Sequence, residues 1–265
     1  MKNHITIIGA GNLTESILKA ISKKTNLFKI NVIDINKKKK NIEKRFNVTF
    51  YSTYTDIISK SDFVVLLVKP KDYISVIDKI NPFISNKTIL LSFMAGITNA
   101  QISKILTSKP SIIRCMTNIT ISDSKSFIFY FMKPFTKIVS NKLEKFLSCF
   151  SKAKKCSSQE QIDKITALYG SGPAYYIYFN QIIKDSFIKM GYNKKESILY
   201  TNDLLQGTAN IIKNNSDSEN IIKSIASKGG TTEAALSDLK KNKINQIITK
   251  AIIKAHKKSK NILNK

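Results

Sequence analysis

The chain has 265 residues, and its 42% hydrophobic content can fill one large core or two modest ones. A formal net charge of +26 would by itself favour a nucleic-acid or membrane-surface partner. However, Arg45 and Arg114 are the only arginines and the lysines are spread along the whole chain, so we expect neither nucleic-acid nor membrane binding.

Strands and helices alternate in the first part of the chain. Short apolar runs rich in Ile and Val predict strands at residues 4–8, 29–33, 63–68, 88–93 and 112–115, and residues 126–131 add one more. Helical patterns lie between and after them, at residues 16–21, 73–80, 99–106 and 134–150. This alternation predicts a parallel sheet covered by helices on both faces.

Strand patterns end at about residue 159, and the rest of the chain has helical patterns. We expect helices at residues 173–190, 194–213, 219–226 and 243–263. The expected fold class is therefore α/β, with an N-terminal Rossmann-like doubly wound domain at residues 1–158 and an all-α C-terminal domain at residues 159–265. Apolar residues recur on these helices in excess of what a few helices can bury, which favours self-association.

A glycine-rich motif follows the first predicted strand directly. Residues 9–14 read Gly-Ala-Gly-Asn-Leu-Thr. Gly9 permits a tight turn out of the strand, and Gly11 lets the backbone approach a pyrophosphate at the N-terminus of the next helix. The third position of such a fingerprint is normally Gly or Ala, so the bulkier Thr14 requires the helix and strand to separate slightly or repack. The motif predicts dinucleotide binding.

The end of the second predicted strand leaves the choice of cofactor open. Asp34 stands where an acidic residue accepts hydrogen bonds from a ribose 2′-OH and repels a 2′-phosphate, which favours NADH. Asn36, Lys37 and Lys38 follow, and they could instead hold the 2′-phosphate of NADPH. A third interpretation is that Asp34 and Asn36 merely cap a helix that begins near Lys37.

The chain lacks the residues for several other kinds of chemistry. His4 and His256 are the only histidines, and no His/Cys/Asp/Glu group has metal-ligand spacing, so we expect no metal site. A GxSxG nucleophile motif is absent, which argues against acyl transfer. The three cysteines form no CxxC pair, the first 30 residues lack signal-peptide features, and no apolar stretch is long enough to span a membrane. These features favour a cytoplasmic location.

Two later glycine motifs each have a structural and a functional interpretation. Residues 170–173, Gly-Ser-Gly-Pro, could simply begin a long helix, or could bring that helix start to a ligand. Residues 229–231, Gly-Gly-Thr, could form an ordinary turn with a helix cap. Their successive backbone N–H groups could also bind the carboxylate of a substrate.

Taken in order, these motifs resemble one family over nearly the whole chain. Residues 9–14 are followed by Val68-Lys69-Pro70, by Ser-Phe-Met-Ala-Gly-Ile at 92–97 and by Arg-Cys-Met-Thr-Asn at 114–118. Gly-Ser-Gly-Pro-Ala-Tyr at 170–175 and Lys-Gly-Gly-Thr-Thr at 228–232 complete the series. The pattern resembles the pyrroline-5-carboxylate reductases. It departs from them at Thr14, at Thr117 and Lys228, which replace prolines, and at Tyr169, which replaces a serine.

The resemblance implies a function and a site. It implies reduction of 1-pyrroline-5-carboxylate to L-proline by hydride transfer from NADPH, with NADH left open, as the last step of proline biosynthesis. It implies a helical domain that binds substrate and forms a homodimer or higher homo-oligomer. The implied substrate-binding residues are Gly229, Gly230, Thr231 and Thr232, and Thr232 also contacts the imine nitrogen in catalysis. The implied cofactor-binding residues are Gly9, Gly11, Asn12, Leu13, Asp34, Asn36, Lys37, Val68, Lys69, Pro70, Ala95, Gly96 and Asn118.

Two alternatives stay open at this point. One is a related nicotinamide or deazaflavin oxidoreductase that acts on another substrate. The motifs at residues 116–118 and 229–232 argue against it, as does the missing lysine after the 170–173 motif, where β-hydroxyacid dehydrogenases carry a catalytic lysine. The other is a basic binding protein on a Rossmann scaffold, without turnover, which would show steeply salt-dependent binding to DNA.

Overall fold

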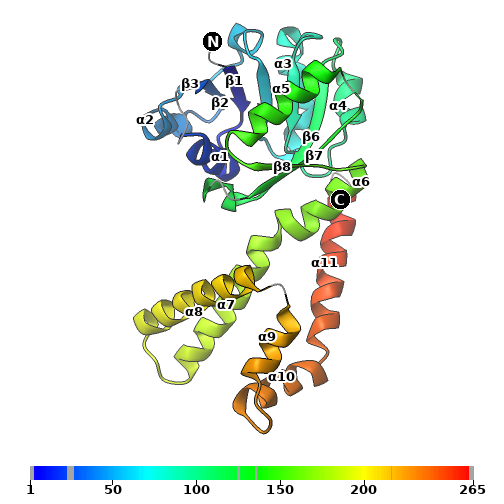
Figure 1. The fold of residues 1–265 in the computed structure, drawn as a ribbon. Helices are drawn as coiled ribbons and strands as arrows, with labels where there is room; N and C mark the ends of the chain where they lie inside the picture. The colour runs from blue at the N-terminus through cyan, green and yellow to red at the C-terminus, as the bar shows by residue number, and fades with distance from the viewer. Residues whose placement is uncertain (1–2, 23–26, 124–125, 135, 216, 263–265) are drawn as a thin grey trace. The chain divides into compact units, whose positions relative to one another are not determined.

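Figure 1 shows the fold in a computed structural model, which describes residues 3–22, 27–123, 126–134, 136–215 and 217–262. The chain divides into two compact units. The sheet unit consists of Met1–Ser171 together with Ala255–Lys265, and the helical unit consists of Gly172–Lys254. The last residues of the chain therefore belong to the same unit as the first.

The described part of the sheet unit contains an eight-stranded sheet in the order β3-β2-β1-β4-β5-β6-β7-β8. The strands are β1 (Asn3–Ile8), β2 (Phe28–Ile33), β3 (Thr49–Tyr51), β4 (Phe63–Leu66), β5 (Ile89–Ser92), β6 (Ser111–Met116), β7 (Phe127–Met132) and β8 (Lys152–Lys155). Neighbouring strands are parallel except β6 and β7. The order reverses between β1 and β4, which is where doubly wound sheets bind dinucleotides.

Helices cover both faces of this sheet. They are α1 (Asn12–Ser22), α2 (Ile42–Phe46), α3 (Tyr73–Ile80), α4 (Asn99–Ile105), α5 (Lys137–Ser148) and α6 (Gln159–Ile165), with 3-10 turns η2 (Lys37–Asn41), η3 (Asp56–Ile58), η4 (Pro70–Asp72), η5 (Asn81–Phe83) and η6 (Ile119–Asp123). A π-helical turn, η7 (Thr166–Gly170), follows α6.

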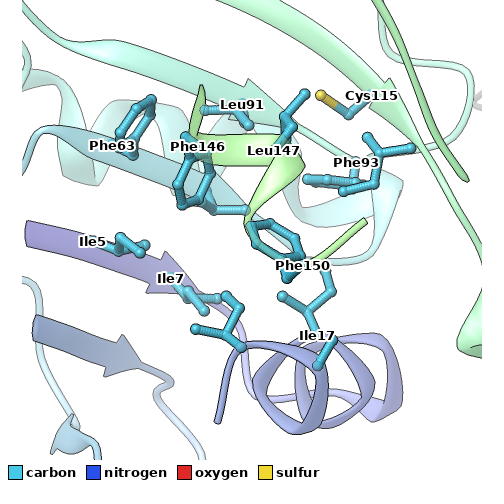
Figure 2. Close-up of a cluster of buried hydrophobic side chains, with 14 of the residues drawn as sticks. Ile5, Ile7, Ile17, Phe63, Leu91, Phe93, Cys115, Phe146, Leu147 and Phe150 are labelled. Atoms are coloured by element: carbon cyan, nitrogen blue, oxygen red, sulfur yellow. The ribbon is translucent and has the colours of Figure 1, made fainter. Parts of the chain in front are cut away.

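Alternating residues of the strands fill two separate cores. Ile7 faces a core that α1 and α5 complete, whereas Ile8 faces a core that α3 and α4 complete. Such alternation follows from the two-residue period of a strand. Figure 2 shows the first core, where Phe146 of α5 stacks on Phe63 of β4 with ring centroids 4.1 Å apart. Both faces of the central strands are therefore buried from solvent, as in other parallel sheets.

The helical unit contains α7 (Gly172–Lys189), α8 (Lys194–Asn214), α9 (Ser218–Ile225), α10 (Thr231–Lys241) and most of α11 (Ile244–Lys260). Many of its large apolar side chains are exposed, among them Tyr176, Ile177, Met190, Leu199, Ile211 and Ile247. No helix in the described part of the chain is long and apolar enough to cross a membrane.

The expected fold class is confirmed: an α/β Rossmann-like unit comes first and helices follow. Six predicted strands match β1, β2, β4, β5, β6 and β7 to within one or two residues. The short strands β3 and β8 and the helix α6 were not predicted, and no range was predicted for α2 or α10. All four residues of β8 are exposed, so this strand lacks the apolar pattern from which the other strands were predicted.

Candidate dinucleotide and substrate sites

The turn between β1 and α1 requires a glycine at its first position. Gly9 has φ +104°, and a Cβ placed on it would lie 2.6 Å from the carbonyl oxygen of Leu67. Its N–H donates to Ile33 O at 2.8 Å, so the turn is held against both neighbouring strand ends. At Gly11, by contrast, a Cβ would meet no atom within 4 Å. Gly11 therefore borders open space, where a ligand can approach the protein backbone closely.

Thr14 is accommodated without an unsatisfied polar group. Its side chain is fully buried, and Thr14 Oγ1 donates to Gly9 O at 2.8 Å. The hydroxyl thus ties the first turn of α1 to the glycine turn, where the family fingerprint has only a small side chain.

A groove with a volume of about 860 Å³ lies at the carboxyl ends of β1, β2, β4 and β5. Most of the predicted cofactor-binding residues line it: Gly9, Gly11, Asn12, Leu13, Asp34, Asn36, Val68, Lys69, Pro70 and Ala95. Lys37, Gly96 and Asn118 do not line it. Its lining also includes Tyr54, Lys39, Lys71, Ser75 and Lys79, which the sequence motifs did not identify.

Both carboxylate oxygens of Asp34 accept backbone hydrogen bonds. Asp34 Oδ2 accepts from Ala10 N–H at 2.7 Å, and Oδ1 accepts from Asn36 N–H at 2.8 Å. Asn36 Oδ1 in turn accepts from Lys38 N–H at 3.1 Å and caps η2. The capping interpretation therefore holds for Asn36, whereas Asp34 joins the glycine turn to the end of β2.

The groove combines positive charge with a neutral phenol. Lys39, Lys69, Lys71 and Lys79 all belong to its lining, and their ammonium groups favour phosphate groups. Burial raises the pKa of the Tyr54 phenol, and the carboxylates of Asp34 and Asp72 raise it further. Tyr54 therefore remains a neutral hydroxyl at physiological pH.

Asn118 and Gly96 have contacts of their own outside the groove. Asn118 Nδ2 donates to Tyr169 O at 2.9 Å, and its Oδ1 accepts from the N–H of Thr120 at 2.9 Å. Gly96 has φ +70°, and a Cβ on it would lie 2.6 Å from Ser259 O and would overlap the side chain of Ile262. Asn118 fastens the loop after β6, and Gly96 leaves room for the end of the chain.

The predicted substrate loop precedes α10 in the helical unit. Gly229 N–H donates to Glu233 Oε2 at 2.6 Å, and Gly230 N–H donates to Ser227 O at 3.0 Å. Gly230 is the N-cap of α10 and makes no side-chain cap, while Thr231 is exposed and Thr232 is partly buried. The first N–H groups of α10, from Thr231 onward, have no acceptor within the helix.

A second cavity, of about 620 Å³, lies between α9 and α10. Gly229, Gly230 and Glu233 line it together with Lys223 and Lys240, whereas Thr231 and Thr232 do not. Glu233 was not predicted as a site residue, although its place at the third position of α10 is a recognisable capping position. Among the described residues, no group of three His, Cys, Asp or Glu side chains could hold a metal ion.

Two family models match different parts of this chain. A model described as "Pyrroline-5-carboxylate reductase dimerisation" matches residues 159–262. A model described as "NADP oxidoreductase coenzyme F420-dependent" matches residues 4–96. The matches cover the helical part and the glycine turn with the first strands, respectively.

Similar proteins extend the likeness to nearly the whole chain. Pyrroline-5-carboxylate reductase 1 of Bacillus spizizenii is 28% identical over 97% of this chain and 89% of its own length. The reductase of Aquifex aeolicus is 26% identical over 97% of both chains. A solved pyrroline-5-carboxylate reductase from Coxiella burnetii has a TM-score of 0.83, with 26% identity over 98% of both chains.

A further solved structure supports the same fold. Plasmodium falciparum pyrroline carboxylate reductase, solved with NADP bound, has a TM-score of 0.86 at 21% identity, over 98% of this chain and 97% of its own. Fold, dinucleotide groove, dimerisation match and full-length relatives agree, and the chain belongs, as an NAD(P)-binding oxidoreductase, to the pyrroline-5-carboxylate reductase family.

Proposed function

We propose that this chain reduces 1-pyrroline-5-carboxylate to L-proline with NADPH, as the last step of proline biosynthesis, in the cytoplasm. The observation that carries the proposal is the groove at the reversal of strand order, in a chain that aligns over 97% of its length with pyrroline-5-carboxylate reductases. NADPH, when bound, would supply the hydride that the carbon of the protonated imine accepts, and the nitrogen would keep its proton in the amine product. The protein's task is to bind and orient the two molecules.

The sheet unit would hold the dinucleotide. Gly9, Gly11, Asn12 and Leu13 would receive the pyrophosphate at the start of α1, where free N–H groups and the helix dipole favour an anion. Val68, Lys69, Pro70 and Ala95 also line the groove and would form the wall that borders the nicotinamide half. Gly96 and Asn118 are proposed to support that wall from outside the groove.

NADPH is the proposed cofactor because of the cations beside Asp34. Both Asp34 oxygens already accept hydrogen bonds from backbone N–H groups, and each retains a lone pair that a ribose hydroxyl of NADH could use. Asn36 and Lys39 line the groove next to this carboxylate, and Lys37 is exposed beside them. An ammonium group here would form a charge-assisted hydrogen bond with a 2′-phosphate.

Lysine variants test this part of the proposal. We expect Lys39→Ala to lower kcat/KM with NADPH about 10-fold or more, the typical cost of a hydrogen bond to a charged group. We expect kcat/KM with NADH to be unchanged. Lys37→Ala is the matched comparison, because the two lysines belong to one run but only Lys39 lines the groove. Equal losses in the two variants would assign the phosphate to the whole lysine run rather than to Lys39.

The start of α10 would hold the substrate. Thr231 is proposed to bind the substrate carboxylate with the free N–H groups of the first turn of α10. Gly229 and Gly230, whose own N–H groups donate to Glu233 and Ser227, are proposed to border the bound substrate. The hydroxyl of Thr232 is proposed to hydrogen-bond the imine nitrogen and so to orient the imine carbon toward the hydride.

A Thr232 pair tests the catalytic role. Thr232→Val keeps the side-chain shape and removes the hydroxyl, and we expect kcat to fall about 100-fold, whereas Thr232→Ser should retain most of the rate. The assay follows the absorbance of NADPH on addition of 1-pyrroline-5-carboxylate, with proline identified as product. A folded wild-type protein that oxidises neither NADPH nor NADH would contradict the proposed reaction and favour a related oxidoreductase or a binding protein without turnover.

We also propose that the chain works as a homodimer or higher homo-oligomer. Residues 1–158 and 159–265 are proposed as its two functional domains, although the compact sheet unit extends to Ser171 and takes in Ala255–Lys265. The dimerisation family model matches residues 159–262, and the same region exposes many large apolar side chains. Exposed apolar surface of this extent is unusual for a monomer and common where subunits meet.

A further inference from the structure

The turn at residues 93–96 forms one wall of the dinucleotide groove. Phe93, Met94 and Ala95 line the groove, and Phe93 N–H donates to Leu66 O at 3.0 Å, which ties the turn to the end of β4. Dinucleotides place their adenosine half near the end of β2 and their nicotinamide half across the reversal of strand order. The turn therefore belongs to the nicotinamide end of the groove.

Ser259 and Ile262, among the last described residues of the chain, pack closely against Gly96 at the end of this turn. Gly96 follows Ala95 directly, and a Cβ at Gly96 would lie 2.6 Å from Ser259 O and would overlap Ile262 Cγ2. Ser259 is only 5% exposed although it lies near the end of the chain. The glycine at position 96 is thus required by the close approach of the C-terminal segment, residues 255–262, as well as by its positive φ.

The C-terminal segment is fastened to α6. Ser259 Oγ donates to Asp163 O at 3.0 Å, and Lys260 Nζ pairs with Glu160 Oε1 at 3.1 Å. The Asp163 carboxylate pairs with the fully buried guanidinium of Arg114 on β6. The side chains of Arg114 and Asp163 are largely buried from solvent. This ion pair therefore fixes α6, and with it the C-terminal segment, against the sheet.

The same helix also holds the residues that follow the turn. Gln159 Oε1, in the first turn of α6, accepts from Asn99 N–H at 3.0 Å, and Asn99 Nδ2 donates to Ile112 O at 3.0 Å. The turn at residues 93–96 is therefore held at its start by β4, behind Gly96 by the C-terminal segment, and beyond it by α6.

We infer that the C-terminal segment positions the nicotinamide wall of the groove, with Ile262 and Ser259 acting on cofactor binding through Gly96 and Ala95. Neither residue lines the groove, so both are positioning residues. The inference rests on the proposed binding of NADPH in this groove. It also means that the dinucleotide site is complete only when the chain has returned from the helical unit to the sheet unit.

Comparing the binding of two ligands distinguishes a positioning role of Ile262 at the nicotinamide wall from a general effect on protein stability. NADPH fills the whole groove, whereas 2′-phospho-ADP-ribose is the same molecule without the nicotinamide ring. Ile262→Ala removes the branched side chain next to Gly96, whereas Ile262→Val retains most of that side chain. Lys257→Ala alters an exposed residue five positions earlier in the chain and serves as the control. Dissociation constants for both ligands are measured on the full-length variants by titration calorimetry.

We expect Ile262→Ala to weaken NADPH binding about 10-fold, the effect of truncating one well-packed side chain, and to change 2′-phospho-ADP-ribose binding less than about 2-fold. Ile262→Val and Lys257→Ala should bind both ligands as the wild type does. Ile262→Ala with unchanged NADPH affinity, or with equal losses for both ligands, would overturn the inference. A wild type that binds neither ligand would overturn the proposed cofactor site itself, and the inference with it.

Discussion

Thr117 and Tyr169 both hold the backbone of a single residue, Phe127. Thr117 Oγ1 donates to Phe127 O at 2.8 Å, and Phe127 N–H donates to Tyr169 Oη at 2.8 Å. The Tyr169 ring also meets the edge of Phe129, with centroids 5.0 Å apart. These two residues are departures from the family motifs, and their shared partner gives a physical reason for them to occur together: hydrogen bonds to one strand residue can hold the loop that a proline would otherwise stiffen.

A double-mutant cycle tests this pairing. Thr117→Val and Tyr169→Phe each remove one hydrogen bond to Phe127 and keep the side-chain shape, so each should lower the free energy of unfolding by about 1 kcal/mol. The double variant should lose less than the sum, because one broken bond already loosens Phe127. Unfolding in urea measures all four proteins. Losses that add within about 0.3 kcal/mol would show that the two side chains act independently.

Asp34 supports the glycine turn as well as bordering the proposed ribose position. Replacing it by alanine leaves the N–H groups of Ala10 and Asn36 without their acceptor. We therefore expect Asp34→Ala to weaken NADH and NADPH binding alike and to destabilise the fold by about 1–3 kcal/mol. Fluorescence titration with both cofactors checks this. A loss confined to NADH would instead mean that Asp34 serves only as a ribose acceptor.

The sequence identifies the residues of the glycine turn, but it does not identify which lysine after β2 lines the groove. Gly9 is recognisable because strand, turn and helix are local features. The run of four lysines at residues 37–40 offered no means of choosing among them. In the structure this run forms the 3-10 turn η2, in which residues three apart share a face, so Lys39 joins Asn36 at the groove. The reason for Gly96 was equally hidden, because its neighbour Ile262 is far away in the sequence.

At the scale of elements, prediction succeeded where the pattern is internal to the element. The central strands are apolar on both faces, so their runs are visible in the sequence. β3 has three residues, and β8 reads Lys-Ala-Lys-Lys. These edge strands owe their conformation to pairing with β2 and β7, which no local pattern records. Lysines on an exposed edge also discourage pairing with other chains.

The packing of α5 on the sheet depends on a carboxylate that should be sensitive to acid. Asp62 precedes β4, accepts from His4 N–H at 2.9 Å on β1 and pairs with Lys142 Nζ of α5 at 2.6 Å. Burial alone would raise the pKa of the Asp62 carboxyl, but the hydrogen bonds from Lys142 and His4 outweigh it and hold the pKa below its usual value. The ionised form therefore stabilises the fold.

Comparison with Asp62→Asn should show this as a function of pH. A carboxyl with a depressed folded-state pKa adds stability above its unfolded pKa of about 3.9 and loses it as pH falls through the folded value. We expect the wild type to be more stable than the variant by up to about 1 kcal/mol from pH 5 to 7, since the pair is partly exposed. The difference should shrink below about pH 4. A difference that is constant down to pH 3 would contradict the assignment.

The start of α10 carries its own negative charge next to the proposed carboxylate site. Glu233 Oε2 accepts from Gly229 N–H at 2.6 Å, so a substrate carboxylate would meet a like charge there. Glu233→Gln keeps an oxygen for Gly229 and removes the charge. We expect it to lower KM for 1-pyrroline-5-carboxylate about 2- to 5-fold at low salt, with kcat little changed and a smaller effect at high salt. A raised KM would mean that Glu233 is needed in its charged form to shape the loop.

For the whole molecule, net charge and exposed apolar surface have different consequences. The charge of +26 keeps chains apart at long range and favours solubility, but it is screened by salt within about 10 Å. The apolar side chains of α7 and α8 act at contact, where screening is irrelevant. Tyr176 is 70% exposed and Leu199 is 63% exposed, far more than a folded monomer needs to leave in water.

Self-association is therefore expected to depend on α7 and α8 and not on the dinucleotide groove. Leu199→Asp places a charge on the apolar surface of α8, and Lys195→Glu makes a charge change at an exposed polar position of the same helix. In sedimentation velocity, the wild type and Lys195→Glu should form dimers or larger species, and Leu199→Asp should shift toward the monomer.

Leu199→Asp should affect cofactor binding and reductase activity differently. The groove lies within the sheet unit, so the Leu199→Asp monomer should retain NADPH affinity within about 3-fold. Its reductase activity should fall with the loss of assembly, since the apolar surface of the proposed substrate-binding domain is left uncovered and its helices lose their packing partners. A fully active monomer would show that one chain suffices for the reaction, and a monomeric wild type at micromolar concentration would contradict the proposed assembly.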